Sequence, residues 1–350
     1  MLRARLGAGG MGQVFLGRSP SGRAVAVKVV HPHLAQQAEF RHRFRREVTA
    51  VRAVSGAFTA PVVAAGPEDD PPWVATVYIP GPTLAEAVAG AGPLPEDAVW
   101  PLAAGLVEAL QAIHDEGLLH RDLKPSNVVL AADGPKVIDF GIARTADATA
   151  LTRIGAAIGT AGFMSPERAE GGDVGPAGDI FSLGAVLAFA ATGGEPFGQG
   201  PPLAIMHRVV SGEPRLDGLR GPVRDLITAC LAKNPADRPA AAQLLEQITV
   251  HWSPPDDSLP WPHAMTTLIN TRAIRATQRY GEAEASTASA AQEREDLDRL
   301  RNHAAEVAGL GDHAQAVELY ADLAADSERV LGPDHPDTVN ARSSSEHWRA

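Results

Sequence analysis

The sequence predicts an α+β fold in which a small strand-rich part precedes a larger helical part and an all-helical tail. The first thirty residues hold β-rich segments separated by Pro and Gly turn residues. From residue 95 onward, apolar residues recur at helical spacing. After about residue 250, a Pro-rich stretch, a run of small residues and a last helical region follow one another.

The individual elements can be assigned in order along the chain. Strands are expected at 13–17 and 24–30, on either side of the turn RSPSGR, and at 72–81. The Arg-dense segment 36–55 and the segment from 95 to Gly117 are expected to be helical. Composition then places a Pro/Ala-rich linker at 251–291 and a helical segment at 292–350. The Pro-rich stretch 252–262 could instead be a packed extended segment.

Length and composition exclude several classes of protein. A chain of 350 residues suggests two or three domains, and 45% hydrophobic with 21% charged residues is an ordinary globular balance. The net charge of −11 argues against nucleic acid or an anionic membrane as partner. The single Cys230 excludes an internal disulfide. Because we find neither an apolar run long enough to span a membrane nor a signal peptide, we expect a soluble, cytoplasmic protein.

A glycine-rich segment near the N-terminus indicates a phosphate-binding turn. In LGAGGMGQV (6–14), Gly7, Gly9 and Gly12 form a G-x-G-x-x-G pattern. Dinucleotide sites with this spacing continue into a helix, whereas a strand follows here. A glycine turn between two strands can lie over phosphates and offer its backbone N–H groups. An ordinary glycine hairpin is the alternative.

Two charged residues follow this turn. Lys28 ends the apolar strand AVAVKVV, and Glu47 comes 19 residues later on the expected Arg-rich helix. A helix packed on that strand could bring the two together. Alternatively, the lysine reaches solvent and the glutamate lies on a solvated helix face.

A polar loop between apolar segments carries the strongest chemical signal. GLLHRDLKPSNVVL (117–130) places Asp122 and Asn127 five residues apart, with Lys124 between them, and Asp139 follows in VIDFG. Two carboxylates and an amide oxygen suit Mg²⁺ and a hydroxyl nucleophile. Any one of these residues could instead be a cap or turn residue, but the ordered set points to phosphoryl transfer.

Over roughly residues 1–250 the chain resembles the eukaryotic-like Ser/Thr protein kinases of bacteria. The motifs that carry the resemblance are the glycine turn, VAVK, HRDLKPSN (120–127), DFG (139–141), GTAGFMSPE (159–167), DIFSLG (179–184) and Arg238 near NPADRP. The resemblance implies a bilobal kinase fold with a β-rich N-lobe over about 1–80 and a helical C-lobe over about 81–250.

The resemblance also implies roles for individual residues, with ATP and Mg²⁺ as cofactors and proteins as substrates. Asp122 orients the substrate hydroxyl and accepts its proton, Lys124 stabilises the γ-phosphoryl group, and Glu47 holds Lys28. Asn127 and Asp139 bind the metal. The implied ATP-binding residues are Leu6, Gly7, Ala8, Gly9, Gly10, Met11, Gly12, Val14, Ala26, Lys28, Thr76, Val77, Ile79 and Val129.

Further implied contacts concern the helical lobe and the hinge. Glu167 is expected to pair with Arg238, and Asp179 to bond the backbone of the catalytic loop. A local surface ion pair or a cap is the alternative for both acidic residues. Val77 stands where the family often has an acidic hinge residue, and SPE replaces the commoner APE. Either the first strand is short or the true start lies upstream of Met1.

Regulation is expected at the loop between Asp139 and Glu167. In such kinases an arginine at the position of Arg121 can bind a phosphate on this loop. Relatives often carry a Thr-x-Thr pair before the threonine that is here Thr160, and only Thr152 of that pair is kept. We therefore expect autophosphorylation chiefly at Thr152 and secondarily at Thr149.

The tail resembles tetratricopeptide repeats, with LGPDHPDT (331–338) as its most specific segment. A partner protein or self-association would then act through it, and a plain helical hairpin is the alternative. Two other functions remain open: a pseudokinase scaffold, against which Lys28, Asp122 and Asp139 are all present, and a small-molecule phosphotransferase, against which GTAGFMSPE argues.

Overall fold

The computed structural model describes residues 2–54, 56–140, 161–253, 261–310 and 313–349, with their side chains except those of 275–292 and 348–349. The chain divides into two compact units, Met1–Ile274 and Arg275–Ala350. The first unit contains a strand-rich lobe and a helical lobe, and the second is helical. The α+β prediction with a helical tail is therefore confirmed.

The strand-rich lobe is an antiparallel sheet with one layer of helix. Its five strands have the order β1-β2-β3-β5-β4, and consecutive strands in that order pair antiparallel. Their bounds are β1 (Leu2–Gly9), β2 (Gly12–Arg18), β3 (Ala24–Val30), β4 (Val62–Gly66) and β5 (Trp73–Val77), with α1 (Pro32–Ala35) and α2 (Ala38–Ala53) between β3 and β4.

Helix α2 forms because one of its faces is apolar at helical spacing. Phe40, Phe44, Val48 and Val51 are buried, while the arginines between them lie on the remaining surface. A fully buried side chain of this kind contributes about 1.5–3 kcal/mol. The segment expected to be helical at 36–55 thus forms the helix that covers the sheet.

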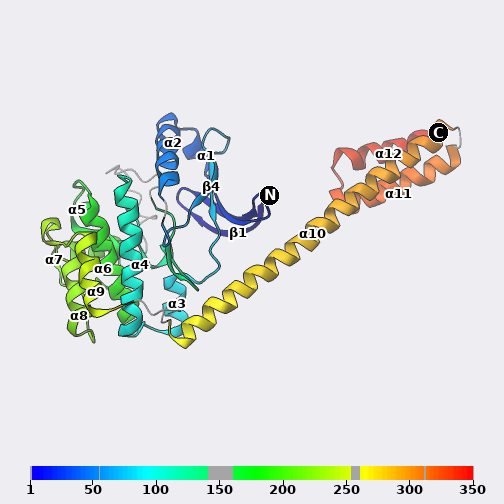
Figure 1. Cartoon of the computed structure of the whole chain (residues 1–350). Coiled ribbons are helices and arrows are strands. Elements are labelled where there is room, and N and C mark those ends of the chain that lie inside the picture. The colour runs from blue at the N-terminus through cyan, green and yellow to red at the C-terminus, as the bar shows by residue number, and fades with distance from the viewer. Residues whose placement is uncertain (1, 55, 141–160, 254–260, 311–312, 350) are drawn as a thin grey trace. The chain divides into compact units, whose positions relative to one another are not determined.

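The helical lobe is built around α6, which is apolar on all sides and therefore central. From Gly178 to Ala188 every residue of α6 is buried. Helices α4 to α9 lie together in Figure 1. Their bounds, with that of α3, are α3 (Leu84–Ala91), α4 (Glu96–Asp115), α5 (Pro166–Ala169), α6 (Pro176–Thr192), α7 (Pro202–Ser211), α8 (Gly221–Cys230) and α9 (Ala241–His251).

A glycine lets α6 approach α8 closely. A Cβ on Gly184 would lie 2.6 Å from the Cβ of Cys230 and 3.1 Å from Cγ of Leu231, so only glycine fits. Cys230 is buried here, and burial raises the pKa of its thiol to about 12. The cysteine is therefore an inert core residue.

A two-stranded hairpin and short 3₁₀ turns complete the first unit. Strands β6 (Val128–Ala131) and β7 (Gly134–Val137) pair antiparallel directly after the polar loop. The 3₁₀ turns are η1 (Pro125–Asn127), η3 (Ala161–Phe163) and η4 (Pro235–Asp237). The hairpin thus separates Asn127 from Asp139 in sequence but brings the chain back beside Asn127, since Ile138 N–H donates to the carbonyl of Asn127 at 3.0 Å.

Helix α10 (His263–Gly309) begins inside the first unit, where the sequence predicts a linker. Met265 and Ile269, one turn apart, are 1% and 3% exposed and join the core of the helical lobe. Trp261 Nε1–H donates to the carbonyl of Ala131, and Arg272 pairs with Glu86 of α3 at 2.7 Å. Residues 261–274 of the expected linker are therefore folded onto the first unit, because their few apolar residues share one helix face.

The second unit contains the end of α10 with α11 (His313–Leu331) and α12 (Pro336–Arg349). Its small core is formed by Leu297, Leu323, Ala324 and Ala341. The helical prediction for 292–350 is confirmed. In the part of the chain that the structure describes, we find no helix with the length and apolar character needed to cross a membrane.

The contact of α10 with the helical lobe can be measured with two matched isoleucines. We expect Ile269→Ala to destabilise the first unit by about 2–5 kcal/mol, because it removes a buried side chain. Ile274→Ala, on the same helix, should cost less than about 0.5 kcal/mol because Ile274 is 58% exposed. Urea unfolding followed by tryptophan fluorescence measures both, and equal effects would contradict the docked arrangement.

Candidate active site

The polar loop after α4 is held in place by one buried carboxylate. Asp179, at the start of α6, accepts hydrogen bonds from the backbone N–H groups of His120 and Arg121, both at 2.8 Å. The Nε2 of His114 lies 2.9 Å from the same carboxylate. Asp179 is 1% exposed. The expected bond from Asp179 to the loop backbone is confirmed.

The electrostatics of Asp179 follow from these partners. Burial by itself raises the pKa of this carboxyl, but the hydrogen bonds with His114 and with the two backbone amides hold the pKa below its usual value. The ionised carboxylate keeps its three partners. Arg121 adopts a left-handed backbone with φ of 63°, a costly conformation for an arginine that these bonds stabilise.

Asp122 is surrounded by the other polar residues of the loop. Its Oδ2 lies 3.0 Å from Nζ of Lys124 and 3.2 Å from Nδ2 of Asn127, which also donates to the Asp122 carbonyl at 2.8 Å. The Asp122 N–H donates to Nδ1 of His120. Burial lowers the pKa of His120, which is therefore neutral and serves as an acceptor here. A lysine and an amide thus orient the Asp122 carboxylate.

The second aspartate faces the sheet of the other lobe. Asp139 Oδ1 lies 3.1 Å from Nζ of Lys28 on β3. Asp139 has a φ of 59°, so it is a second non-glycine residue in the left-handed region. This ion pair joins the two lobes across the site.

The structure does not bring Glu47 to Lys28. Within the described residues the carboxylate partner of Lys28 is Asp139, and no ion pair links Lys28 to Glu47. Glu47 is half-buried on α2, between the buried Phe44 and Val48. The expected Lys28–Glu47 pair is therefore absent from this arrangement, because the lysine ammonium is turned toward Asp139.

A pocket between the lobes contains several of the predicted nucleotide-site residues. Four of them, Val14, Ala26, Lys28 and Thr76, line it together with the expected metal ligand Asp139. Phe140, the middle residue of the DFG motif, also lines it. The other lining residues are Val51, Ala60 and Val74, whose apolar character in the sequence does not distinguish them from ordinary core residues.

Val129 lies outside this lining set, on β6. It pairs with Lys136 of β7 and forms an isolated bridge with Thr83, the residue that caps α3.

Two of the three backbone amides in the predicted hinge, residues 77–79, already make hydrogen bonds within the chain. Val77 N–H donates to the carbonyl of Pro61 and Tyr78 N–H to that of Ala24. Ile79 N–H is the amide of this segment for which we find no such bond within the described chain.

The glycine turn spans the ends of β1 and β2. Gly9 pairs with Gly12 across it, and Ala8 pairs with Gln13. A Cβ on Gly12 would lie 2.0 Å from the carbonyl oxygen of Val29, so close contact with β3 requires this glycine. Gly7, Gly9 and Gly10 instead have open space where a Cβ would stand, and Leu6 is 41% exposed. The outer face of the turn is thus unobstructed.

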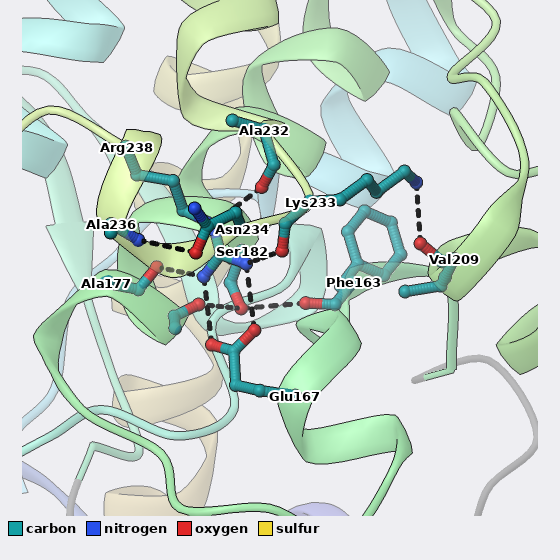
Figure 2. A network of polar contacts seen from close by, with 11 residues as sticks. Phe163, Glu167, Ala177, Ser182, Val209, Ala232, Lys233, Asn234, Ala236 and Arg238 are labelled. Carbon is teal, nitrogen blue, oxygen red and sulfur yellow. Dashed lines mark hydrogen bonds and ion pairs between the residues drawn. The ribbon is translucent and has the colours of Figure 1, made fainter.

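The segment after the 141–160 range is anchored by a buried ion pair, shown in Figure 2. Arg238 contacts Glu167 in a bidentate manner, at 2.9 Å and 2.8 Å, and its side chain is fully buried. The same guanidinium donates to the carbonyls of Ala177, Ala232 and Lys233. The expected pair is confirmed, and it is a buried network rather than a surface bridge.

Ser182 on α6 adds a second anchor for this segment. Its hydroxyl donates to the carbonyl of Phe163 at 2.7 Å. Burial alone raises the pKa of Glu167, but Arg238 lowers it below its usual value. Residues 161–167 are therefore fixed to α6 and to the 232–238 segment.

The predicted regulatory residues lie partly inside and partly outside the part of the chain that the structure describes. Arg121 is placed, and its carbonyl accepts a hydrogen bond from Arg168. Thr149, Thr152 and Thr160 lie outside the residues that the structure describes.

The donor set near Asp139 fits a divalent ion that is also bound by phosphate. Asp139 offers a carboxylate, and Asn127 retains its amide Oδ1 because Nδ2 makes both of its bonds to Asp122. Within the described residues no group of three or more His, Cys, Asp or Glu side chains could hold a metal by itself. Mg²⁺ sites that use one or two protein oxygens complete their shell with substrate phosphates and water.

Comparisons with known proteins agree with this geometry. The family model of the protein kinase domain matches residues 2–249. The probable serine/threonine-protein kinase PkwA of Thermomonospora curvata is 55% identical over 262 residues, which cover 75% of this chain and 35% of that protein. The serine/threonine-protein kinase AfsK of Streptomyces coelicolor is 51% identical over 71% of this chain and 31% of its own.

The fold comparison gives the same class. The crystal structure of the PknI kinase domain of Mycobacterium tuberculosis aligns with a TM-score of 0.57 and 26% identity, covering 72% of this chain and 95% of that one. The chain therefore belongs to the protein kinase family. It spans about a third of the length of the curated relatives PkwA and AfsK.

The buried ion pair predicts a large effect on stability. Arg238→Ala leaves the half-buried Glu167 without its charged partner, so we expect a loss of about 3–5 kcal/mol. Arg43→Ala removes an ion pair with Glu39, whose side chain is 83% exposed, and should cost about 1 kcal/mol or less. Thermal and urea unfolding of the two variants and the wild type measure the difference. A loss in Arg238→Ala no larger than that in Arg43→Ala would contradict the structural role of the pair.

Proposed function

We propose that this protein transfers the γ-phosphoryl group of ATP to Ser and Thr hydroxyls on proteins, including itself. One observation carries the proposal: Asp122 is oriented by Lys124 and Asn127 in a loop that Asp179 fixes to the core. A carboxylate held in this way can orient a hydroxyl and accept its proton. The family membership and the serine/threonine-protein kinase names of the relatives support the choice of reaction.

The roles of the remaining residues follow from their chemistry. The open face of the glycine turn supports contact between backbone N–H groups and the ATP phosphates. Lys28 would neutralise the α- and β-phosphates, which requires it to exchange Asp139 for phosphate oxygen. Lys124 would stabilise the transferring group. Most of the rate acceleration would come from positioning and fixed charge, since phosphoryl transfer needs little covalent help from the protein.

The apolar part of the pocket supports an adenine site. Val14 of β2 and Ala26 of β3 line the pocket, and Val129 lies on β6 of the other lobe. With the amides of Val77 and Tyr78 already bonded, the N–H of Ile79 is the hinge donor we assign to the base. Thr76 would guard the back of the pocket.

We assign the divalent ion as Mg²⁺ and its protein ligands as Asn127 and Asp139. When bound, the ion would neutralise charge on the phosphate oxygens. Hard oxygen donors of this number, completed by phosphate, suit Mg²⁺ better than a soft metal. The 3.1 Å contact between Lys28 Nζ and Asp139, whose side chain is 39% exposed, supports the access of a cation to this carboxylate.

A second part of the proposal concerns the helical second unit. Ala316 and Leu323 on α11 are buried at helical spacing, with Tyr320 packed beside them, which supports a tetratricopeptide-like helix pair. We propose that it binds a partner protein or a second copy of the chain.

We also propose a cytoplasmic location, with proteins as substrates and no role in nucleic-acid binding. The net charge of −11 supports the absence of a nucleic-acid partner.

Two substitutions test the catalytic assignment. Asp122→Asn removes the proton acceptor, and Lys28→Met removes the phosphate-binding charge. Each should reduce phosphorylation by about a thousandfold or more while leaving the melting temperature close to that of the wild type. Initial rates with Mg²⁺, radiolabelled ATP and a generic acceptor protein such as casein measure the loss.

Asp133→Asn is the matched control for Asp122→Asn. Asp133 lies in the neighbouring hairpin turn, is 72% exposed, and pairs with Lys136. It should retain near-normal turnover. Turnover of purified Asp122→Asn or Lys28→Met close to that of the wild type would disprove the assignment of roles.

The regulatory proposal concerns the loop between Asp139 and Glu167. We propose that autophosphorylation occurs chiefly at Thr152 and secondarily at Thr149, and that Arg121 helps to bind the added phosphate. A phosphate adds about −1.5 to −2 charge and forms one to three charge-assisted hydrogen bonds with arginines.

Mass spectrometry of protein incubated with Mg²⁺ and ATP should find phosphate on Thr152. Thr152→Ala should lower activity more than Thr149→Ala does. An unphosphorylated Thr152 in an active sample, together with unchanged activity of Thr152→Ala, would exclude this switch.

A further inference from the structure

One residue outside the motifs holds the glycine turn at two points. The ring Nε2 of His31 lies 3.0 Å from the carbonyl oxygen of Gly9. The backbone N–H of the same residue donates to the carbonyl oxygen of Met11 at 2.8 Å. Gly9 ends β1 and Met11 immediately precedes β2, so both contacts fall on the turn itself.

The position of His31 is itself fixed by its surroundings. It follows Val30, the last residue of β3, which pairs with Gly12 across the β2–β3 ladder. Its carbonyl accepts hydrogen bonds from the N–H groups of Leu34 and Ala35 in α1. Its ring stacks on that of His33, with centroids 5.6 Å apart and planes 20° apart. The histidine therefore meets the turn from a rigid position.

The ring contact has a consequence for the backbone of the turn. In a trans peptide the C=O of one residue and the N–H of the next point in opposite directions. Holding the Gly9 carbonyl toward His31 therefore directs the Gly10 N–H away from it. Gly10 also has no atoms within 4 Å of where its Cβ would stand, so no side chain or neighbouring strand crowds its Cα. Glycine by itself would sample many orientations here.

The contact does not depend on the charge of the ring. A carbonyl accepts, so Nε2 must carry a hydrogen, which is true of the neutral Nε2–H tautomer and of the imidazolium alike. The contact therefore serves as a constant support for the turn.

We propose that His31 is a positioning residue that pre-orients the glycine turn for the phosphates of a nucleoside triphosphate. The proposal rests on the proposed function, in which this turn binds ATP. A turn that is already oriented loses less conformational freedom when it binds its ligand, and the affinity is correspondingly higher. His31 contacts the turn rather than the reacting atoms, so it acts on nucleotide binding more than on the chemical step.

The test compares three variants in the full chain. His31→Ala removes the ring contact and should raise the KM for ATP by about 3- to 10-fold, the equivalent of one hydrogen bond, with kcat within about twofold of the wild type. His31→Gln carries an amide Nε2 that can donate to the same carbonyl and should restore most of the affinity. His42→Ala is the control, because His42 is an exposed histidine of α2 for which we find no bond to the glycine turn in the described chain, and it should leave KM unchanged.

Binding of a non-hydrolysable ATP analogue with Mg²⁺, followed by calorimetry, gives a readout that does not need turnover. A parallel rise in the dissociation constant of His31→Ala, reversed in His31→Gln, supports the proposal. An unchanged dissociation constant in His31→Ala, an equal loss in His42→Ala, or no recovery in His31→Gln overturns it. If the wild type binds the analogue but phosphorylates no protein, the proposed function is wrong, whereas the effect of His31 on nucleotide binding is still measured.

Discussion

The rest of the site depends on the hydrogen bonds made by the buried carboxylate of Asp179. A charged group without exposure is stable only if its oxygens are fully bonded, and here two backbone amides and one histidine bond them. These bonds hold Arg121 in a left-handed conformation and so determine where Asp122 begins. Because Asp179 stands on the central helix α6, the loop takes its position from the core of the lobe.

A second buried charge, that of Arg238, holds residues 161–167 in place. Arg238 binds Glu167 and three backbone carbonyls, and therefore joins α5, α6 and the 232–238 segment. Both anchors end on α6. The catalytic loop and residues 161–167 thus share one rigid support, as a proposed reaction between two positioned groups requires.

The upper part of the site depends on contacts between the lobes and within the sheet. Lys28 on β3 meets Asp139 of the other lobe, and the glycine turn meets β3 through Gly12 and His31. These contacts hold Lys28 and the glycine turn at one end of the proposed nucleotide site, whereas the polar loop rests on the apolar core of the helical lobe.

The class of fold and the order of its elements could be predicted from the sequence. Motif spacing also predicted that Asp122, Lys124 and Asn127 belong to one short loop, and these three side chains meet in the structure. Local patterns could also identify α2 and α4, because one apolar face suffices to specify an amphipathic helix.

Contacts between groups that are distant in the sequence could not be predicted in this way. The sequence placed a linker at 251–291, but Met265 and Ile269 pack on the helical lobe, because two apolar residues one turn apart become significant only beside a matching surface. It paired Lys28 with Glu47, whereas the ammonium meets Asp139. It gave no sign of His31, whose contact with Gly9 joins residues 22 positions apart. Such contacts depend on how β1 and β2 fold back onto β3, and a linear pattern holds no record of that approach.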